Sequence, residues 1–158
     1  MSDCVFCAII RDEAPAAAVW RSSEAVAFLD RTPVFPGHVL VVPTAHCVTL
    51  PDLAADAIGP FFAVVQRIAA LLPAALGADG TWVSMNNVVS QSVAHLHVHV
   101  VPRRRKDGLK GFYWPRQRYP SDEAMYETAA VITAALTAEF TKDREAAAAL
   151  KKDDGAPH

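Results

Sequence analysis

Three histidines, His95, His97 and His99, occupy every second position of one short apolar stretch. Apolar residues at a period of two are typical of a β-strand, in which alternate side chains point to opposite faces. The pattern therefore predicts a strand with its imidazoles on one face and an apolar face towards a core. Because three adjacent imidazoles are costly on a purely structural strand, we interpret this face as functional; a merely polar or metal-binding strand face is the alternative. The intervening apolar residues are Leu96, Val98 and Val100.

Length and composition bound the class of protein. A chain of 158 residues suits one domain, and its 52% of apolar residues is enough for a core. The net charge of −2 creates no global field that would recruit nucleic acid. No apolar run approaches the roughly 20 residues that span a bilayer, and the N-terminus lacks the pattern of a signal peptide. We therefore expect a cytoplasmic protein with neither a nucleic-acid nor a membrane partner.

The three cysteines point away from disulfides. An odd number of cysteines in a cytosolic chain argues against a disulfide framework and leaves metal binding open. Cys4 and Cys7 form a Cys-x-x-Cys pair in a predicted short helix, which suits a zinc half-site, a redox pair or plain packing. His46 is either an ordinary loop histidine or a third ligand for a metal held by that pair. Cys47 is interpreted as a small packing residue.

The remaining patterns predict a mixture of strands and helices. Residues 19–21 and 25–29 suit a hairpin, 38–43 a central strand buried on both faces, and 82–85 a short strand. Residues 52–72 carry apolar side chains at helical spacing, and Pro60 predicts a kink or a helix restart. Because residues 61–72 are apolar around much of the helix, this segment is either sandwiched or part of a subunit interface.

The composition changes after Pro102. Residues 103–118 hold seven lysines and arginines against the single acid Asp107. This segment is either a solvated basic loop or a phosphate-attracting rim beside the histidines. Ser121 suits the N-cap of a helix that continues to about residue 140. We expect one domain over 1–140 and a helical extension that frays into a disordered tail over 141–158.

The histidine stretch, with Gln91-Ser92 ahead of it and Pro102-Arg103 behind, resembles the signature of the histidine triad (HIT) family of nucleotide hydrolases and transferases. The resemblance covers roughly residues 4–105 and is to bacterial-type members with an N-terminal Cys-x-x-Cys. It implies an α+β fold with a mainly antiparallel five-stranded sheet, a long helix and a homodimer, here with a C-terminal helical extension. It also includes Phe28-Leu29-Asp30, the segment Pro36–Pro43, His46 and Asn86.

The resemblance implies a covalent mechanism. His97 occupies the position of the family nucleophile, which attacks the α-phosphate of a purine nucleotide and forms a nucleotidyl-histidine that water then hydrolyses. A neutral imidazole is a good nucleophile near pH 7 once an acceptor fixes its tautomer. By the same resemblance, His99 binds phosphate and helps to position the nucleophile, and His38 is the further histidine beside the triad. No catalytic metal is required.

Four more residues are implied to bind substrate. Asp30 resembles the acid that accepts hydrogen bonds from the ribose hydroxyls, although a turn-capping role is the alternative. Gln91 and Ser92 match positions that bond to phosphate oxygens or the bridging atom. Asn86 resembles an asparagine near the leaving group, a role that the neighbouring Asn87 could take instead. Where many members have glycines before the glutamine, this chain has Val88-Val89-Ser90.

The resemblance also unites the cysteines with two histidines. Bacterial-type members hold a structural zinc with such a cysteine pair, a histidine like His46 and the first triad histidine. Two thiolates and two imidazoles close a tetrahedral site. The implied ligands are Cys4, Cys7, His46 and His95, which leaves His97 and His99 for phosphate.

Four functional hypotheses follow. The first is a nucleoside phosphoramidase or phosphohydrolase that releases a nucleoside monophosphate. The second is a dinucleoside polyphosphate hydrolase or phosphorylase, in which the basic segment 103–118 serves a longer polyphosphate. The third is a non-catalytic, zinc-stabilised nucleotide-binding protein, which would not require a nucleophile. The fourth is a metal-dependent hydrolase that uses the histidine face as its metal site and is inactivated at once by chelators.

Overall fold

The computed structural model describes residues 4–109, 119–134 and 141. Internal contacts divide the chain into two compact units, Met1–Gly111 and Phe112–His158. The first unit contains every labelled strand and helix. The predicted boundary at residue 140 and the tail over 142–158 lie outside the described residues, so that division of the chain stays a prediction.

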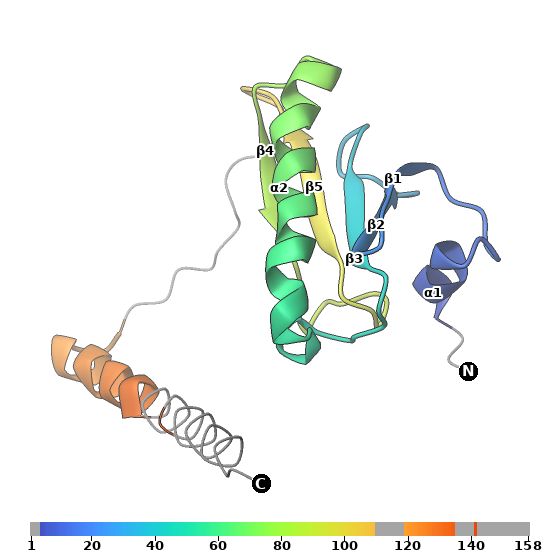
Figure 1. The fold of residues 1–158 in the computed structure, drawn as a ribbon. Coiled ribbons are helices and arrows are strands. Elements are labelled where there is room, and N and C mark those ends of the chain that lie inside the picture. Colours follow the sequence, from blue (N-terminus) through green and yellow to red (C-terminus); the bar gives the residue numbers. More distant parts are fainter. Residues whose placement is uncertain (1–3, 110–118, 135–140, 142–158) are drawn as a thin grey trace, which may run out of the picture. The chain divides into compact units, whose positions relative to one another are not determined.

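Five antiparallel strands form a single sheet in the first unit (Figure 1). The strand order β1-β2-β3-β5-β4 places the histidine-bearing segment next to the central strand, with β4 on its other side. The predicted hairpin, central strand and short strand are all present, and the five-stranded antiparallel sheet is confirmed. The strands are β1 (Ala18–Arg21), β2 (Ala25–Leu29), β3 (Val39–Pro43), β4 (Gly80–Ser84) and β5 (Val98–Arg103).

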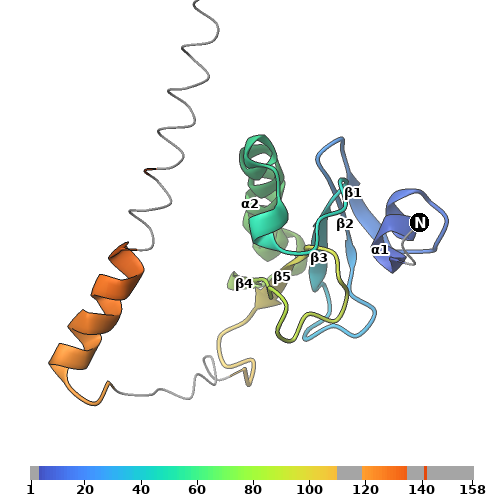
Figure 2. The ribbon, with the colours of Figure 1, turned by 90° about the horizontal axis from the view of Figure 1, so that it is seen from below.

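The sheet lies between two helices on opposite faces. The long helix α2 (Ala55–Leu76) covers one face and the short helix α1 (Val5–Ile10) lies against the other (Figures 1 and 2). Alternate residues of β2 and β3 therefore enter two separate apolar clusters, and β3 is buried along its whole length as predicted. On the α1 side the cluster consists of Phe6, Ile9, Val26, Phe28, Leu40 and Val42.

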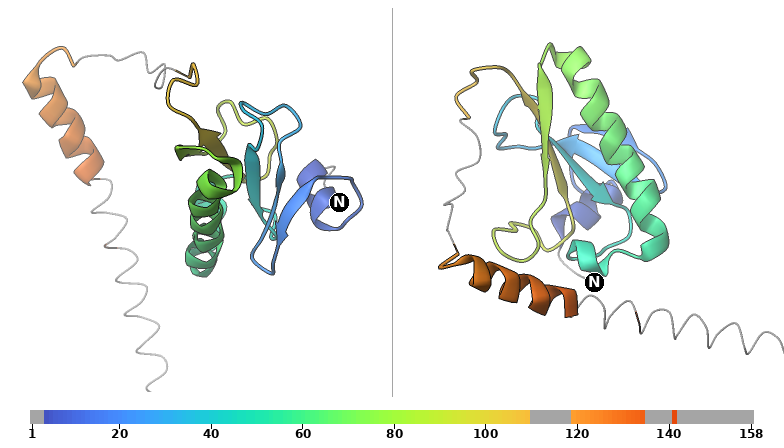
Figure 3. Two further views of the ribbon diagram at one scale, coloured as in Figure 1. Left: turned by 90° about the horizontal axis from the view of Figure 1, so that it is seen from above. Right: turned by 90° about the vertical axis from the view of Figure 1, so that its left-hand side faces the viewer.

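Helix α2 is continuous through Pro60, so of the two predicted alternatives the restart was wrong, and the kink stays a prediction. The helix runs as one continuous ribbon (Figure 3). It contains both Pro60 and Pro73, and its C-cap is Gly77, whose backbone is left-handed (φ 60°). Pro60 is the sixth residue of the helix and removes a single backbone hydrogen bond. The buried side chains of Phe61 and Val65, directly after it, anchor the helix to the sheet.

Helix α2 also corrects the expectation about membrane spans. An 18-residue window of this 22-residue helix has a mean hydropathy of 1.6, so by length and composition alone the helix is long and apolar enough to cross a membrane. The sequence contains no uninterrupted apolar run of this length, because Gln66 and Arg67 divide the apolar residues of the helix. Side chains such as Ile58 and Leu71 lie exposed, at 42% and 67%. The predicted subunit interface on this helix stays a prediction.

The histidine stretch is only partly a strand. Strand β5 begins at Val98, so His95 and His97 precede it, contrary to the prediction. The physical reason is that the Leu96 N–H bonds to the Cys47 carbonyl, 2.7 Å away, in a loop contact outside the strand ladders. The alternation of faces nevertheless holds, because the residues between the histidines all join the α2-side cluster: Leu96, Val98 and Val100.

The second unit contains a helix over residues 122–134. The predicted N-cap is confirmed, since the backbone N–H of Ala124 donates to the hydroxyl of Ser121 at 3.3 Å. The predicted continuation to residue 140 lies outside the described residues. This helix and the sheet complete the α+β fold with a C-terminal helix.

Candidate active site and metal site

The ring of His97 is buried, and a carbonyl group orients it. Its Nδ1 atom lies 2.8 Å from the backbone oxygen of His95, and only 2% of the residue is exposed. A carbonyl oxygen only accepts hydrogen bonds, so the proton of a neutral His97 resides on Nδ1. The Nε2 atom then keeps its lone pair, which is the state that a nitrogen nucleophile needs.

A chain of hydrogen bonds defines the neighbouring histidines. The backbone N–H of Val34 donates to Nδ1 of His38 at 3.3 Å, so that nitrogen acts as an acceptor. The proton of a neutral His38 is therefore on Nε2, which lies 3.0 Å from Nδ1 of His99. It follows that a neutral His99 carries its own proton on Nε2 and has a donor to offer.

Burial keeps this histidine pair neutral. Burial, together with smaller contributions from the nearby His97 and His38, lowers the pKa of His99 to about 4. Burial also lowers the pKa of His38, and the carboxylate of Asp30 opposes that shift without reversing it. The ring centroid of His99 lies 5.0 Å from that of His97. The site therefore has an unprotonated Nε2 on His97 and an Nε2–H donor on the adjacent ring of His99.

Asp30 lies beside this group but is also a turn-capping residue. Its Oδ1 accepts hydrogen bonds from the backbone N–H and the hydroxyl of Thr32, at 2.9 and 3.3 Å. Its Oδ2 lies 3.5 Å from Nδ1 of His38. The turn-capping interpretation is therefore correct, and the predicted role towards ribose stays a prediction. Asp30, His38 and His99 place ligand-type atoms within 4.8 Å of one another, but the two histidines already bond to each other.

The loop before the triad is held by its own polar side chains. Gln91 donates to the carbonyl of Val48 at 2.6 Å, while its Oε1 accepts from the N–H of Val88 at 2.9 Å. Asn86 donates to the carbonyl of Ser90, and Asn87 accepts from the N–H of Leu50. These bonds shape the loop and leave the substrate roles predicted for Gln91 and Asn86 untested. Ser92 is exposed on the same loop.

This loop keeps a glycine-type backbone without glycines. Val88 and Ser90 have φ values of +69° and +60°, in the left-handed region that β-branched residues rarely adopt. These are two of the three positions where many family members have glycines. The departure from the family pattern thus concerns residue type, while the backbone conformation that favours glycine is retained, with strain at Val88.

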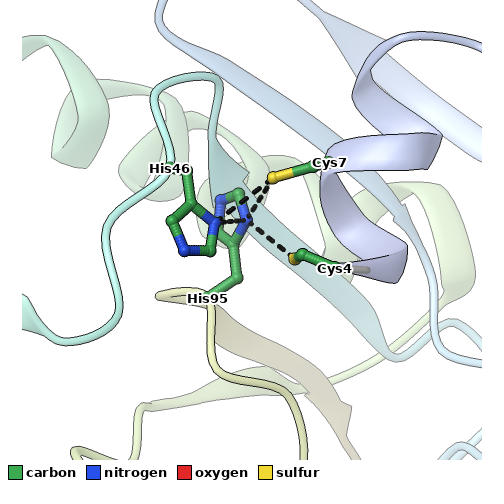
Figure 4. A group of neighbouring side chains, drawn as sticks. All are labelled: Cys4, Cys7, His46 and His95. Carbon is green, nitrogen blue, oxygen red and sulfur yellow. Dashed lines mark hydrogen bonds between the residues drawn. The ribbon is translucent and has the colours of Figure 1, made fainter. Parts of the chain in front are cut away.

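Four side chains from three separate segments converge next to the triad (Figure 4). Cys4 and Cys7 come from the start of α1, His46 follows β3, and His95 is the first triad histidine. Their ligand-type atoms all lie within 4.8 Å of one another. The structure therefore brings together all four residues that the family resemblance implied as zinc ligands.

The distances within this cluster fit a tetrahedral ion. With Zn–S bonds near 2.3 Å and Zn–N bonds near 2.0–2.1 Å, a tetrahedron has S···N edges of about 3.5 Å and N···N edges of about 3.3 Å. Nδ1 of His95 lies 3.5 and 3.6 Å from the two sulfur atoms and 3.3 Å from Nδ1 of His46. Sγ of Cys7 lies 3.2 Å from Nδ1 of His46.

The protonation states fit a cation as well. Nε2 of His95 lies 2.9 Å from the carbonyl oxygen of Pro43, so it carries the proton and Nδ1 presents a lone pair to the cluster. Burial lowers the pKa of His95 and keeps it neutral. Burial also raises the pKa of Cys7, and Cys4 raises it further. A divalent ion would supply the positive charge that a thiolate needs here.

The basic segment after β5 is partly structural. Arg103 makes a two-bond ion pair with Asp107, at 2.6 and 3.0 Å, which lowers the pKa of that carboxyl to about 2. Arg104 donates to the carbonyls of Leu76 and Gly77 at the end of α2. These bonds tie the two arginines to the fold, and neither the solvated-loop nor the phosphate-rim interpretation is tested for them. Residues 110–118 lie outside the described residues.

Several functional groups were missed by sequence reasoning. The acceptors at Pro43 and His95 and the donor at Val34 are backbone groups, which leave no mark on residue type. Phe6 was also missed, although its ring packs edge-on against His97 with centroids 5.4 Å apart. Its only signal was its place between the two cysteines.

These features define a member of the histidine triad class, and the chain belongs to the HIT family: residues 11–106 match its domain model. An uncharacterized HIT-like protein of Mycobacterium tuberculosis is 42% identical over 108 residues, or 67% of this chain and 75% of that protein. An adenosine 5'-monophosphoramidase of Saccharomyces cerevisiae is 34% identical over 123 residues, or 76% and 75% of the two chains.

A solved structure supports both the fold and the metal comparison. The crystal structure of a zinc-bound histidine triad family protein from Mycobacterium smegmatis superposes with a TM-score of 0.65 and 35% identity. The match covers 86% of this chain and 97% of that one. The family resemblance and the fold that it implied are confirmed.

Proposed function

We propose that this protein is a nucleotide hydrolase that cleaves purine nucleotide conjugates at the α-phosphate, with nucleoside phosphoramidates as the leading substrate class. The observation that carries the proposal is the orientation of His97, whose Nδ1 lies 2.8 Å from the His95 carbonyl. Its relationship to a yeast adenosine 5'-monophosphoramidase supports the same class of reaction.

The reaction proceeds in two displacements. Nε2 of His97 attacks the α-phosphorus, the bond from phosphorus to the leaving nitrogen or oxygen breaks, and a nucleotidyl-histidine forms. Water then attacks the same phosphorus, releases the nucleoside monophosphate and returns the electron pair to Nε2. Two displacements on one bound phosphate suit a nucleophile that is fixed in a single tautomer.

The neighbouring groups serve the phosphate and the sugar. The N–H at Nε2 of His99 donates to a phosphate oxygen or to the leaving atom, and His38 keeps that proton in place through Nδ1 of His99. Asp30 accepts from the ribose hydroxyls with the oxygen that faces His38. Gln91, Ser92 and Asn86 contact the phosphate and leaving group from the loop. A donor of this kind is worth about 10²–10³ in kcat when it stabilises developing charge.

A structural zinc ion completes the proposal. Cys4, Cys7, His46 and His95 would hold it, and all four coordination positions would be filled by protein. Support comes from the tetrahedral spacing of the four side chains and from the zinc-bound relative in M. smegmatis. When bound, the ion ties the N-terminal segment to the triad and takes no part in bond breaking.

We further propose a homodimer in the cytoplasm. Exposed apolar side chains on α2, such as Leu71 at 67%, supply a surface for a second copy of the chain. Sedimentation of the purified protein measures its oligomeric state directly, and a monomer at micromolar concentration would contradict the proposed homodimer.

The function is tested by turnover on an adenosine phosphoramidate and on a diadenosine polyphosphate. We expect faster release of adenosine monophosphate from the phosphoramidate, and no release by a His97→Ala protein that keeps its fold. A preference for the diadenosine substrate would favour the second hypothesis. Full turnover by the His97→Ala protein would sink the proposal, and immediate loss of turnover on chelation would favour a catalytic metal.

A further inference from the structure

We infer that the cysteine–histidine cluster positions the nucleophile: by orienting the peptide group between His95 and Leu96, it holds His97 in its reactive tautomer. The inference rests on the proposed function for the role of His97. It goes further because it assigns to the cluster an influence on the reacting nitrogen in addition to stabilising the fold.

The peptide group between His95 and Leu96 makes two hydrogen bonds, one with the His97 ring and one with Cys47. Its carbonyl oxygen accepts from Nδ1–H of His97 at 2.8 Å. Its N–H donates to the carbonyl oxygen of Cys47 at 2.7 Å. Because a peptide group is planar, whatever fixes the direction of its N–H also fixes the direction of its C=O. The orientation of the His97 ring therefore depends on where Cys47 lies.

The cluster also links the two segments that the hydrogen bond from Leu96 to Cys47 connects. His46 directly precedes Cys47, and His95 contributes the carbonyl itself. Their Nδ1 atoms lie 3.3 Å apart, at the separation of two nitrogen ligands on one tetrahedral ion. An ion that binds both imidazoles locks the Cys47 carbonyl against the Leu96 N–H. Without an ion, the two segments lose their shared ligand bonds.

Phe6 forms a second connection between the cluster and the nucleophile. Its ring packs edge-on against His97 and His95, with centroids 5.4 and 6.0 Å away. It belongs to α1, which has six residues and no side-chain hydrogen bond at its N-cap. A helix so short has little stability of its own, so the two cysteines that would bind the ion keep Phe6 against the nucleophile.

A merely structural metal makes a different prediction from a positioning metal. If the ion only stabilises the fold, its removal lowers the midpoint of unfolding and leaves the His97 ring unchanged in the folded protein. If it positions the nucleophile, its removal alters the tautomer of His97 while the sheet remains folded. The two cases are therefore separated by a measurement on the imidazole itself.

The test is a long-range ¹H–¹⁵N correlation spectrum of the histidine rings at pH 7.5. It is recorded on the zinc-loaded protein, after zinc removal with a chelator, and after zinc is restored; a His97→Gln spectrum assigns the signals. We expect the zinc-bound protein to show only the Nδ1–H tautomer of His97, the zinc-free protein to show both tautomers, and restoration of zinc to return the single tautomer. An unchanged His97 pattern in a folded, zinc-free protein would overturn the inference.

A variant that keeps all four ligands protects the test against unfolding. Phe6→Leu removes the ring contact, and Phe62→Leu makes the same change on α2, on the other face of the sheet. We expect Phe6→Leu to retain one zinc per chain and to lower kcat several-fold with little change in KM, whereas Phe62→Leu leaves kcat unchanged. Equal kcat values and identical His97 signals in both variants would count against the inference.

The two proposals fail separately. If no nucleotide conjugate is turned over, the proposed function fails, yet the spectra still report whether zinc controls the His97 tautomer. If turnover is present but the tautomer ignores zinc, only the positioning role fails.

Discussion

His95 and His97 are two residues apart and equally buried, yet the structure assigns them opposite tautomers. Nε2 of His95 faces the Pro43 carbonyl, so Nδ1 turns its lone pair to the two cysteines. Nδ1 of His97 faces the His95 carbonyl, so Nε2 keeps the lone pair. One ring is thereby suited to bind a metal and the other to attack phosphorus. Different backbone carbonyls fix different tautomers in two side chains of the same type.

The electrostatic surroundings follow the same division. On the cysteine side, burial raises the pKa of Cys7, so its thiolate would need a nearby cation. On the catalytic side, burial lowers the pKa of His99 to about 4, so the pair with His38 stays neutral without one. We therefore propose a metal for the cysteine group alone.

The largest effect separates the two histidines by function. His97→Ala removes the nucleophile and should lower the rate of nucleotide release by on the order of 10⁴-fold or more, with the metal content unchanged. His95→Ala should abolish metal binding. Steady-state kinetics on an adenosine phosphoramidate, with elemental analysis of both proteins, measures the contrast. A His97→Ala protein that lost its metal would contradict the assignment of separate roles to His95 and His97.

The next effect concerns the metal side alone. A Cys4→Ser, Cys7→Ser protein should lose its zinc and several kcal/mol of stability, because the binding free energy of a structural ion contributes to folding. Cys47→Ser is the matched control, since that thiol lies outside the cluster. Thermal unfolding and metal stoichiometry are the measurements. Equal zinc content in the two proteins would contradict the assignment of the ligands.

A smaller effect concerns the catalytic side alone and depends on pH. The folded pKa of His99, about 4, lies below the unfolded value of about 6.5, so the unfolded chain binds more protons between these values. Its contribution to stability is therefore complete above pH 6.5 and is lost as the pH falls towards 4, by at most about 3 kcal/mol. Urea unfolding at pH 7 and pH 5 should show a larger drop for wild type than for His99→Asn. Parallel pH profiles would argue against the burial of a neutral His99.

The smallest effect tests the loop that leads to both histidines. Val88→Gly should stabilise the protein by up to about 1 kcal/mol, because relief of left-handed strain, about 1–2 kcal/mol, exceeds the entropic cost of glycine, about 0.5–1 kcal/mol. Val89→Gly, at a neighbour without positive φ, should destabilise it. Urea denaturation of both variants measures the difference. A change of the same sign in the unfolding free energy of both variants would contradict the strain assigned to Val88.

Local side-chain patterns predicted individual elements, and the family resemblance implied the five-stranded sheet. Two short apolar segments gave the hairpin, a continuous apolar run gave the doubly buried β3, and alternation separated the histidines from Leu96, Val98 and Val100. Periodicity could not predict where β5 starts, because the Leu96 N–H bonds to Cys47 across the loop. It also could not predict an unbroken α2, because the packing of Phe61 and Val65 lies outside any local pattern.

The site was predictable in its members and unpredictable in their states. The cysteine pair, His46 and the triad were all named from sequence and resemblance, and the structure brings them into two adjacent groups. Which nitrogen of each ring carries the proton depends on carbonyls and an N–H that belong to other residues. Such contacts are created by the fold and have no counterpart in the identity of the histidines.

The most direct test of the central claim is to locate the phosphorus on the trapped intermediate. The protein is mixed briefly with an adenylate donor and quenched, the modified peptide is identified by mass spectrometry, and the bonded nitrogen is assigned by NMR of the ¹⁵N-labelled adduct. We predict an adenylyl group on Nε2 of His97. An adduct on Nδ1, on another histidine, or on no residue while turnover continues would contradict it.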